Sequence, residues 1–129
     1  MNVDSWQTQL RKGAAELVVL SLLRRRELYG VELLDLAGGN DGIVSDGTLY
    51  PLLARLEREG KLAGEWALPQ DAKIPRKYYR LTAEGEALLA EMQRLWRDFS
   101  AFVDGAIEER KDEPAPARPR RSVARRARA

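Results

Sequence analysis

The chain has 129 residues, of which 33% are charged and 44% hydrophobic, and its 22 basic and 20 acidic residues leave a net charge of +2. It contains neither cysteine nor histidine, which excludes disulfides, thiolate or imidazole zinc sites and catalytic triads with histidine. No apolar run approaches the ~18 residues that span a membrane, and Met1–Asp4 lacks the basic-then-apolar order of a signal peptide. We therefore expect one cytoplasmic domain with a tail, no metal or other cofactor, no membrane partner and no enzymatic activity.

The first expected helix spans Trp6–Arg25. Asp4 and Gln7 stand three residues apart and fit a capping box at its start. Between Ala14 and Leu23, apolar residues lie on nearly all sides of the helix. This pattern predicts that most of its surface is buried.

Two shorter helices are expected next. The first spans Gly30–Ala37 and ends at Gly38, since glycine favours the left-handed end of a helix. The other spans Asp46–Glu59, with Ser45 as its N-cap and Gly60 as its stop.

Pro51 is awkward inside the third helix because proline lacks the N–H that a helix interior needs. Either the regular helix begins near Thr48–Tyr50, with Pro51 in its first turn, or the first turn is kinked. The apolar positions of this helix follow the spacing i, i+3, i+4, i+7 and predict one buried face, formed by Leu49, Leu52, Leu53 and Leu56.

The apolar period then changes from helical to two. Residues 62–68 alternate, a loop follows over Pro69–Pro75, and a second extended run covers 76–81. Two such runs joined by a loop predict a β-hairpin. Basic residues gather at the loop end and on the second run, with only Asp71 opposed: Lys73, Arg76, Lys77 and Arg80.

A long last helix is expected over Ala83–Glu109, with Thr82 as its cap. A heptad seam of apolar residues follows it, formed by Leu88, Met92, Leu95, Phe99, Phe102 and Ala106. Leu89, Trp96, Val103 and Ile107 widen this seam. A rod of ~40 Å cannot be covered along its whole length by so small a body, so we expect a homodimer that buries the seam.

The end of the chain differs in composition. Residues 111–129 hold seven basic and two acidic residues, a charge of +5, so residues 1–110 carry −3. The last segment is rich in proline, alanine and arginine and lacks apolar periodicity, which predicts a disordered basic tail.

Three helices, a hairpin and a long helix follow one another in the order of a winged helix-turn-helix protein. We therefore expect a mainly α fold with a small β-hairpin: a DNA-binding domain over 1–82, a C-terminal dimerisation helix over 83–110 and the tail over 111–129. In such a fold the third helix enters the major groove and the hairpin, or wing, contacts phosphates. The candidate DNA contacts are Ser45, Asp46, Thr48, Tyr50, Arg55, Lys73, Arg76 and Lys77.

Each candidate also has a simpler interpretation. Ser45 fits a helix cap, Tyr50 fits a packing position inside the domain, and the wing cations fit an ordinary solvated loop. Asp46 would repel phosphate, and it fits either a cap or an acceptor for a cytosine amine.

Two strings in the chain resemble the PadR family of bacterial transcription regulators: Ser45–Gly60 (SDGTLYPLLARLEREG) and Pro75–Gly85 (PRKYYRLTAEG). The upstream string Glu16–Leu23 (ELVVLSLL) and the pair Tyr29-Gly30 fit the same pattern. The resemblance covers roughly residues 11–108. It implies a winged helix-turn-helix homodimer that represses genes by binding a nearly palindromic operator.

The resemblance also implies roles for single residues. Tyr29, Ser45, Thr48, Tyr50, Arg76 and Lys77 would lie near DNA. The last helix, helped by the first, would form the dimer interface, at Leu17, Leu88, Met92, Leu95, Trp96, Phe99, Phe102 and Val103. Some members bind a small flat aromatic or phenolic effector near this interface, which would stack here on Trp96, beside Leu89 and Met92.

One competing interpretation keeps the fold and the dimer but not the DNA. In it, the protein is an interaction adaptor, which the charge of −3 on residues 1–110 and the carboxylate of Asp46 favour. An enzyme is the weakest interpretation, because the sequence establishes no carboxylate pair and offers no histidine or cysteine.

Overall fold

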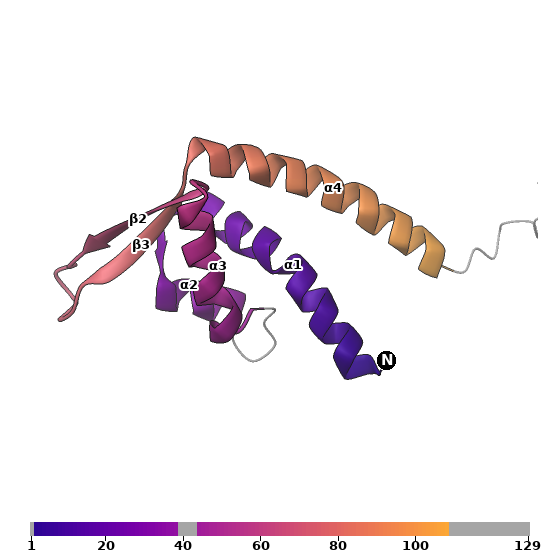
Figure 1. The fold of residues 1–129 in the computed structure, drawn as a ribbon, viewed down its shortest axis with the longest axis horizontal. Helices are drawn as coiled ribbons and strands as arrows, with labels where there is room; N and C mark the ends of the chain where they lie inside the picture. Colours follow the sequence, from indigo (N-terminus) through magenta and orange to yellow (C-terminus); the bar gives the residue numbers. More distant parts are fainter. Residues whose placement is uncertain (1, 39–43, 109–129) are drawn as a thin grey trace, which may run out of the picture. The chain divides into compact units, whose positions relative to one another are not determined.

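The computed structural model describes residues 2–38 and 44–108. These residues form four helices and a three-stranded sheet (Figure 1), in the order α1 (Val3–Arg25), β1 (Leu28–Tyr29), α2 (Gly30–Ala37), α3 (Asp46–Arg58), β2 (Leu62–Ala67), β3 (Arg76–Leu81) and α4 (Ala83–Ile107). The chain divides into two compact units within α4, after Arg97. The mainly α fold with a hairpin and a long C-terminal helix is thus confirmed, while the predicted tail lies outside the described residues.

The N-terminus corrects one prediction. α1 begins at Val3 rather than at Trp6, and Asn2 is its N-cap, with Oδ1 accepting a hydrogen bond of 2.8 Å from the Ser5 N–H. The capping box expected from Asp4 is therefore wrong, and Asp4 lies inside the first turn. Asparagine caps a helix as well as aspartate does. Asn2 can therefore act as the N-cap, and the helix starts directly after it.

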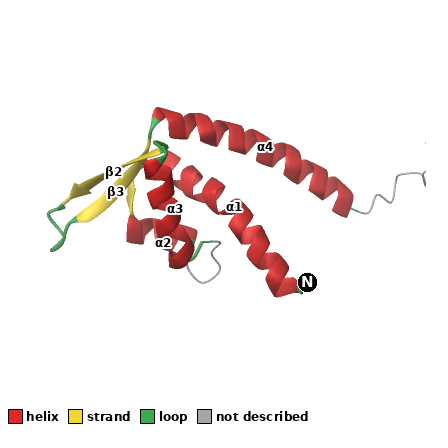
Figure 2. Ribbon diagram, in the orientation of Figure 1, coloured by secondary structure: helices red, strands yellow, loops and turns green. Residues whose placement is uncertain are grey.

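The sheet contains one strand that the apolar pattern did not indicate. The strand order is β1-β3-β2, and both pairings are antiparallel. β1 has two residues, which is too short to show a period of two. β2 and β3 form the predicted hairpin, paired from Leu62 with Leu81 to Ala67 with Arg76 (Figure 2). We call this hairpin, with its loop 68–75, the wing.

α3 begins at Asp46, directly after Ser45, as expected. Pro51 therefore lies in the second turn of the helix, and the proposal that the helix begins near Thr48–Tyr50 is wrong. Gly60 follows the end of α3 with φ of 81°, the left-handed conformation that glycine adopts without strain. The chain can thus turn directly from α3 into β2.

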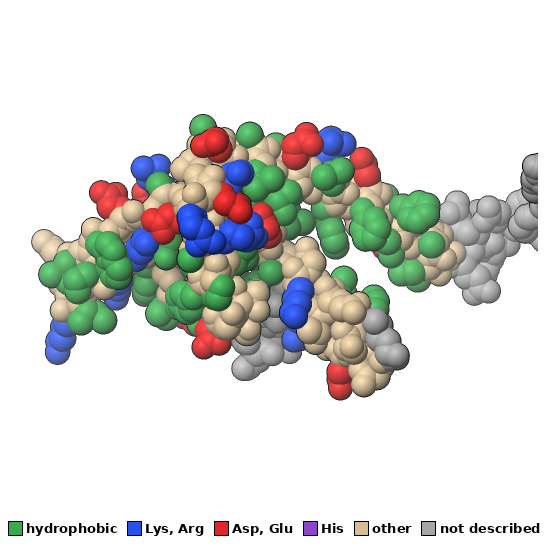
Figure 3. Space-filling view, in the orientation of Figure 1, with side chains coloured by type: hydrophobic (Ala, Val, Ile, Leu, Met, Phe, Trp, Pro, Cys, Tyr) green, Lys and Arg blue, Asp and Glu red, His purple; other side chains and the backbone are tan. Residues whose placement is uncertain are grey.

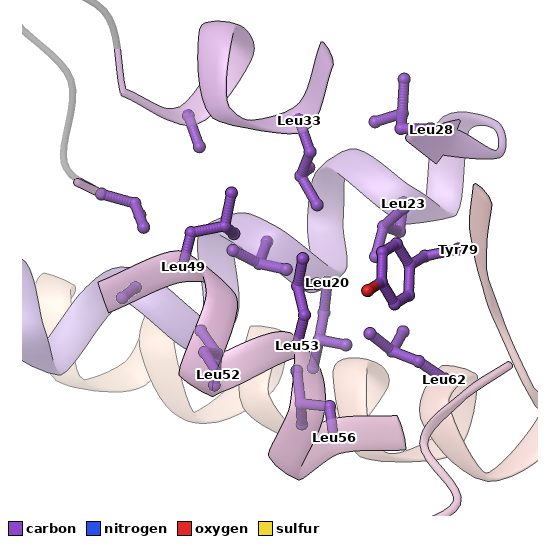
Figure 4. Packing of buried hydrophobic residues seen from close by; sticks show 14 of the residues in the cluster. Leu20, Leu23, Leu28, Leu33, Leu49, Leu52, Leu53, Leu56, Leu62 and Tyr79 are labelled. Atoms are coloured by element: carbon purple, nitrogen blue, oxygen red, sulfur yellow. The ribbon is translucent and has the colours of Figure 1, made fainter. Parts of the chain in front are cut away.

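The core is wholly apolar among the described residues. The predicted face of α3 is confirmed as its centre, and Leu49, Leu53 and Leu56 are fully buried. Figure 4 shows leucines from α1, α2 and α3 converging with Tyr79 of β3 and Leu62 of β2. Burial of each leucine contributes roughly 1.5–3 kcal/mol, so the packing of this face fixes which side of α3 remains outside.

The start of α4 is attached to the same core. Thr82 Oγ1 donates to the Gly60 carbonyl at 2.6 Å and accepts from the Gly85 N–H at 3.0 Å, which confirms the predicted cap. Gly85 is buried and packs against the Lys61 carbonyl, where a Cβ atom would overlap the oxygen. Leu89, one turn later, is part of the core. α4 ends at Ile107, two residues before the expected end at Glu109.

Candidate nucleic-acid interface

At the start of α3, the outer face of the helix carries mainly small side chains, one carboxylate and one tyrosine ring. Ser45, Asp46, Gly47 and Tyr50 are exposed, and Thr48 is half-buried. Ser45 is the N-cap residue, but its side chain makes no capping bond to the backbone. Its hydroxyl instead donates to Thr48 Oγ1 at 3.3 Å, so both hydroxyls remain at the exposed beginning of the helix.

Tyr50 is not an internal packing residue, because it is 42% exposed. Its ring rests on the backbone of Gly30, where an added Cβ would lie 2.9 Å from Tyr50 Cε1. Gly30, at the start of α2, therefore leaves space for the ring of Tyr50. This contact fixes Tyr50 at the junction of the two helices while leaving part of the ring in solvent.

Tyr29 and Arg76 form a contact at the junction of the sheet and α2. The Arg76 guanidinium lies 4.4 Å from the centroid of the Tyr29 ring, and Tyr78 meets that ring edge to face at 5.4 Å. A hydrogen bond with the Tyr78 side chain raises the pKa of Arg76 above its ordinary value. The stacked ring orients a cation that remains accessible at the base of the wing loop.

Lys77 is tethered inside the protomer. Its Nζ donates to Glu57 Oε1 at 2.8 Å and lies 5.4 Å from the centroid of the Tyr79 ring. Gly64 on β2 makes room for this pair, since a Cβ there would lie 2.5 Å from Lys77 Cε and 3.0 Å from Glu57 Oε2. Lys77 thus joins the wing to α3, and its predicted contact with phosphate stays a prediction.

Arg55 is also engaged by acids. Its guanidinium donates to Glu16 of α1 at 2.7 Å and to Glu59 at 3.1 Å. The hydrogen bond to Glu16 is the main cause that raises the pKa of Arg55. Arg55 thus joins α3 to α1, and its predicted contact with DNA stays a prediction.

A groove of about 710 Å³ brings several of these parts together. Tyr29, Tyr50, Lys73, Arg76 and Lys77 all border it, which places Tyr50, in the second turn of α3, beside the wing loop. Lys73 is exposed and forms no ion pair within residues 2–38 and 44–108. Of the predicted DNA residues of α3 and its N-cap, Tyr50 thus adjoins those of the wing, whereas Ser45, Thr48 and Arg55 do not line this groove.

Three apolar residues at this groove were missed by the sequence analysis. Val31, Trp66 and Ile74 line it and are more than half exposed, with Trp66 at 66%. Figure 3 shows hydrophobic and basic side chains side by side over the wing. The alternation of β2 placed Trp66 on one face of a strand, but it could not show that this face lacks a covering element.

The predicted dimer residues differ in their exposure. Leu17, Leu88 and Met92 pack against the core, and Val103 is half-buried. The remaining members of the set are exposed large apolar side chains: Leu95, Trp96, Phe99 and Phe102. The C-terminal part of the set thus meets solvent in the single chain, which is the condition that the dimer prediction requires.

The predicted effector residues are not all available. Trp96 is 45% exposed, whereas Leu89 is 1% exposed and belongs to the core. Leu89 cannot line an open pocket without unpacking that core. In the described part of the chain, no group of three or more acidic side chains could hold a metal ion, and no helix there is long and apolar enough to cross a membrane.

The tether between Lys77 and Glu57 has a predictable pH dependence. The hydrogen bond to Glu57 raises the pKa of Lys77 above its ordinary value of 10.5, so the folded state holds this proton more tightly than the unfolded state. The pair therefore stabilises the fold below pH 10.5, and this contribution disappears as the pH rises through the folded pKa. We expect Glu57→Gln to lower the free energy of unfolding by about 0.5 kcal/mol at pH 7, measured by urea denaturation, and by less at pH 11.

Glu65→Gln is the matched control, because Glu65 is exposed on the same wing and forms no ion pair among the described residues. Its effect on stability should not change between pH 7 and pH 11. An effect of Glu57→Gln that is equally large at both values would contradict the assigned tether.

The comparisons with known proteins agree with this geometry. Residues 19–91 match the Transcriptional regulator PadR-like family. A transcriptional regulator of Mycobacterium tuberculosis is 33% identical over 97 residues, which cover 75% of this chain and 89% of that protein.

Solved structures give the same result. A PadR-family transcriptional regulator from Eggerthella lenta is 37% identical with a TM-score of 0.71, over 84% of this chain and 94% of that one. A PadR-like transcriptional regulator from Bacillus cereus is 31% identical with a TM-score of 0.68, over 79% of this chain and 99% of the other. With the family match extending over the helix-turn-helix, the wing and the start of α4, the chain belongs to the PadR-like family of transcriptional regulators.

Proposed function

We propose that this protein is a repressor that binds operator DNA as a homodimer, with α3 in the major groove and the wing on the phosphates. The observation that carries the proposal is the shared groove at which Tyr50 of α3 adjoins Lys73 and Arg76 of the wing. When the two surfaces are adjacent, the wing cations can contact the phosphates of a duplex while the exposed face of the helix contacts its bases. In this proposal residues 1–82 bind DNA, 83–110 dimerise, and the tail over 111–129 adds affinity that is independent of sequence.

The adaptor function remains the second candidate, and the exposed apolar side chains of Val31, Trp66 and Ile74 favour it. Selection of bound sequences from a pool of random duplexes separates the two. A repressor recovers a nearly palindromic sequence with half-sites about one helical turn apart. An adaptor recovers none.

The wing cations should differ in their effect on DNA binding. Replacing Lys73 or Arg76 by alanine removes a cation that forms no ion pair within residues 2–38 and 44–108, so each variant should weaken binding to all duplexes and reduce the slope of log K against log salt by about 1. Lys77→Ala should change this slope less, because Glu57 already neutralises that amine. Titrations of the selected operator and a scrambled duplex at several salt concentrations measure each slope. If all three variants keep the wild-type slope, the wing does not contact phosphates.

The exposed side chains of α4 should hold the dimer together. Leu95 and Phe99 are 55% and 62% exposed in the single chain, so a Leu95→Glu and Phe99→Glu double variant should remain folded and sediment as a monomer. Its affinity for the operator should fall because the two half-sites are no longer bound by one molecule.

Ala90→Glu with Ala101→Glu is the matched control, since both alanines are exposed and stand on the opposite side of a helical wheel from Leu95 and Phe99. This control adds the same charge and should remain dimeric. A dimeric Leu95→Glu and Phe99→Glu variant would place the interface elsewhere.

We also propose that a flat aromatic effector stacks on Trp96 and weakens operator binding. Its partly exposed ring supports the proposal, and the burial of Leu89 leaves Met92 as the neighbouring wall. With Trp6 and Trp66 replaced by phenylalanine, Trp96 becomes the single fluorescent reporter. Addition of 4-hydroxycinnamate should quench it and reduce operator affinity; unchanged fluorescence up to millimolar concentrations would contradict this site for that class of compound.

A further inference from the structure

The recognition helix lacks the side chains that most often recognise purines. Residues 45–54, the N-cap and the first two and a half turns of α3, contain no arginine, lysine, asparagine or glutamine. Bidentate contacts to guanine come from arginine or lysine, and those to adenine come from asparagine or glutamine. The nearest cation beyond this segment, Arg55, is already bound by Glu16 and Glu59. These common purine contacts are therefore unavailable to this part of the helix.

The outer ridge of α3 offers apolar groups in their place. Tyr50, Pro51 and Ala54 are exposed, on the side opposite to the buried leucines. In the major groove, the apolar group that distinguishes one base pair from another is the C5 methyl of thymine. A ring from Tyr50, a ring from Pro51 and a methyl from Ala54 are groups that such a methyl contacts favourably.

Gly47 on the same ridge has no explanation within the protomer. Its φ is not positive, and an added Cβ would meet only Ser45 Oγ, at 4.0 Å. Since neither the backbone nor the packing requires it, we attribute Gly47 to a surface outside the protomer that approaches the α3 backbone closely.

Asp46 adds a polar preference to this apolar ridge. It is exposed and forms no ion pair in the part of the chain that the structure describes. A carboxylate accepts hydrogen bonds but cannot donate them, so phosphates and the acceptors of guanine repel it. The donors that the major groove offers are the exocyclic amines of cytosine and adenine.

We propose that α3 reads its operator through thymine C5 methyl groups, contacted by Tyr50, Pro51 and Ala54, with Asp46 accepting from the exocyclic amine of cytosine or adenine. This proposal rests on the proposed function, since it assumes that α3 enters the major groove. In this proposal the wing cations bind the phosphates, and the apolar ridge determines the sequence preference.

The test uses the operator recovered from the random pool and the full-length protein. In one duplex, 2′-deoxyuridine replaces every thymidine of the two half-sites, which removes the methyl groups and keeps the base pairs. Affinity should fall about fourfold for each contacted methyl, measured by fluorescence anisotropy. A duplex with the same replacement only outside the half-sites is the control and should bind as the unmodified operator does.

Two variants assign the effect to α3. Pro51→Ala removes the ring and restores a helical N–H, so it should fold at least as stably and discriminate less between the thymidine and deoxyuridine duplexes. Lys73→Ala should weaken both duplexes equally and keep the discrimination. Pool selection repeated with Asp46→Ala should lose the preference for cytosine or adenine at one position of each half-site.

The outcomes separate the two levels of the proposal. A protein that selects an operator but binds the deoxyuridine duplex equally well is still a repressor, and methyl recognition is then wrong. A protein that selects no sequence overturns both. Full discrimination retained by Pro51→Ala would remove Pro51 from the reading surface, and an unchanged preference in the Asp46→Ala selection would remove Asp46.

Discussion

The recognition surface depends on the burial of one face of α3. Leu49, Leu53 and Leu56 are fully buried, and a rotation of the helix would expose them at a cost of roughly 1.5–3 kcal/mol for each leucine. This constraint decides that Tyr50, Pro51 and Ala54 face solvent. Two ion pairs then fix the neighbours of the helix, because Arg55 binds Glu16 of α1 and Lys77 binds Glu57 from the wing.

The same ion pairs explain how residues 1–110, with a net charge of −3, can present exposed cations at the groove. Basic residues near the interface fall into two groups: Arg55 and Lys77 form ion pairs with acids of the protomer, whereas Lys73 and Arg76 form none among the described residues. The net charge of residues 1–110 is thus a poor guide to the local charge at the groove. In the proposed complex, phosphate attraction would therefore come from the wing loop and its base rather than from the outer face of α3.

The sequence predicted what local periodicity determines and missed what distant pairing determines. The leucine spacing of α3, the alternation of the hairpin and the cap at Thr82 depend on residues within one or two turns, and the structure contains all three. The pairing of Arg55 with Glu16 joins residues 39 positions apart, and that of Lys77 with Glu57 joins residues 20 apart. The spacing of residues along the sequence does not indicate ion-pair partners that are so far apart. Local patterns therefore predicted the same role for Arg55, Lys77 and Arg76, although the guanidinium of Arg55 and the amine of Lys77 bind acids of the protomer.

Apolar base recognition and dimerisation support each other physically. A ridge that recognises methyl groups forms few charged contacts, so under this proposal the ridge of one protomer gains little free energy from one half-site. Joining two such surfaces makes the second contact intramolecular and multiplies the affinity without any new kind of interaction. The exposed aromatic side chains of α4, Phe99 and Phe102 among them, are therefore more than an apolar surface that needs covering. Under this proposal they convert a weak but selective reading surface into a repressor that recognises a symmetric site.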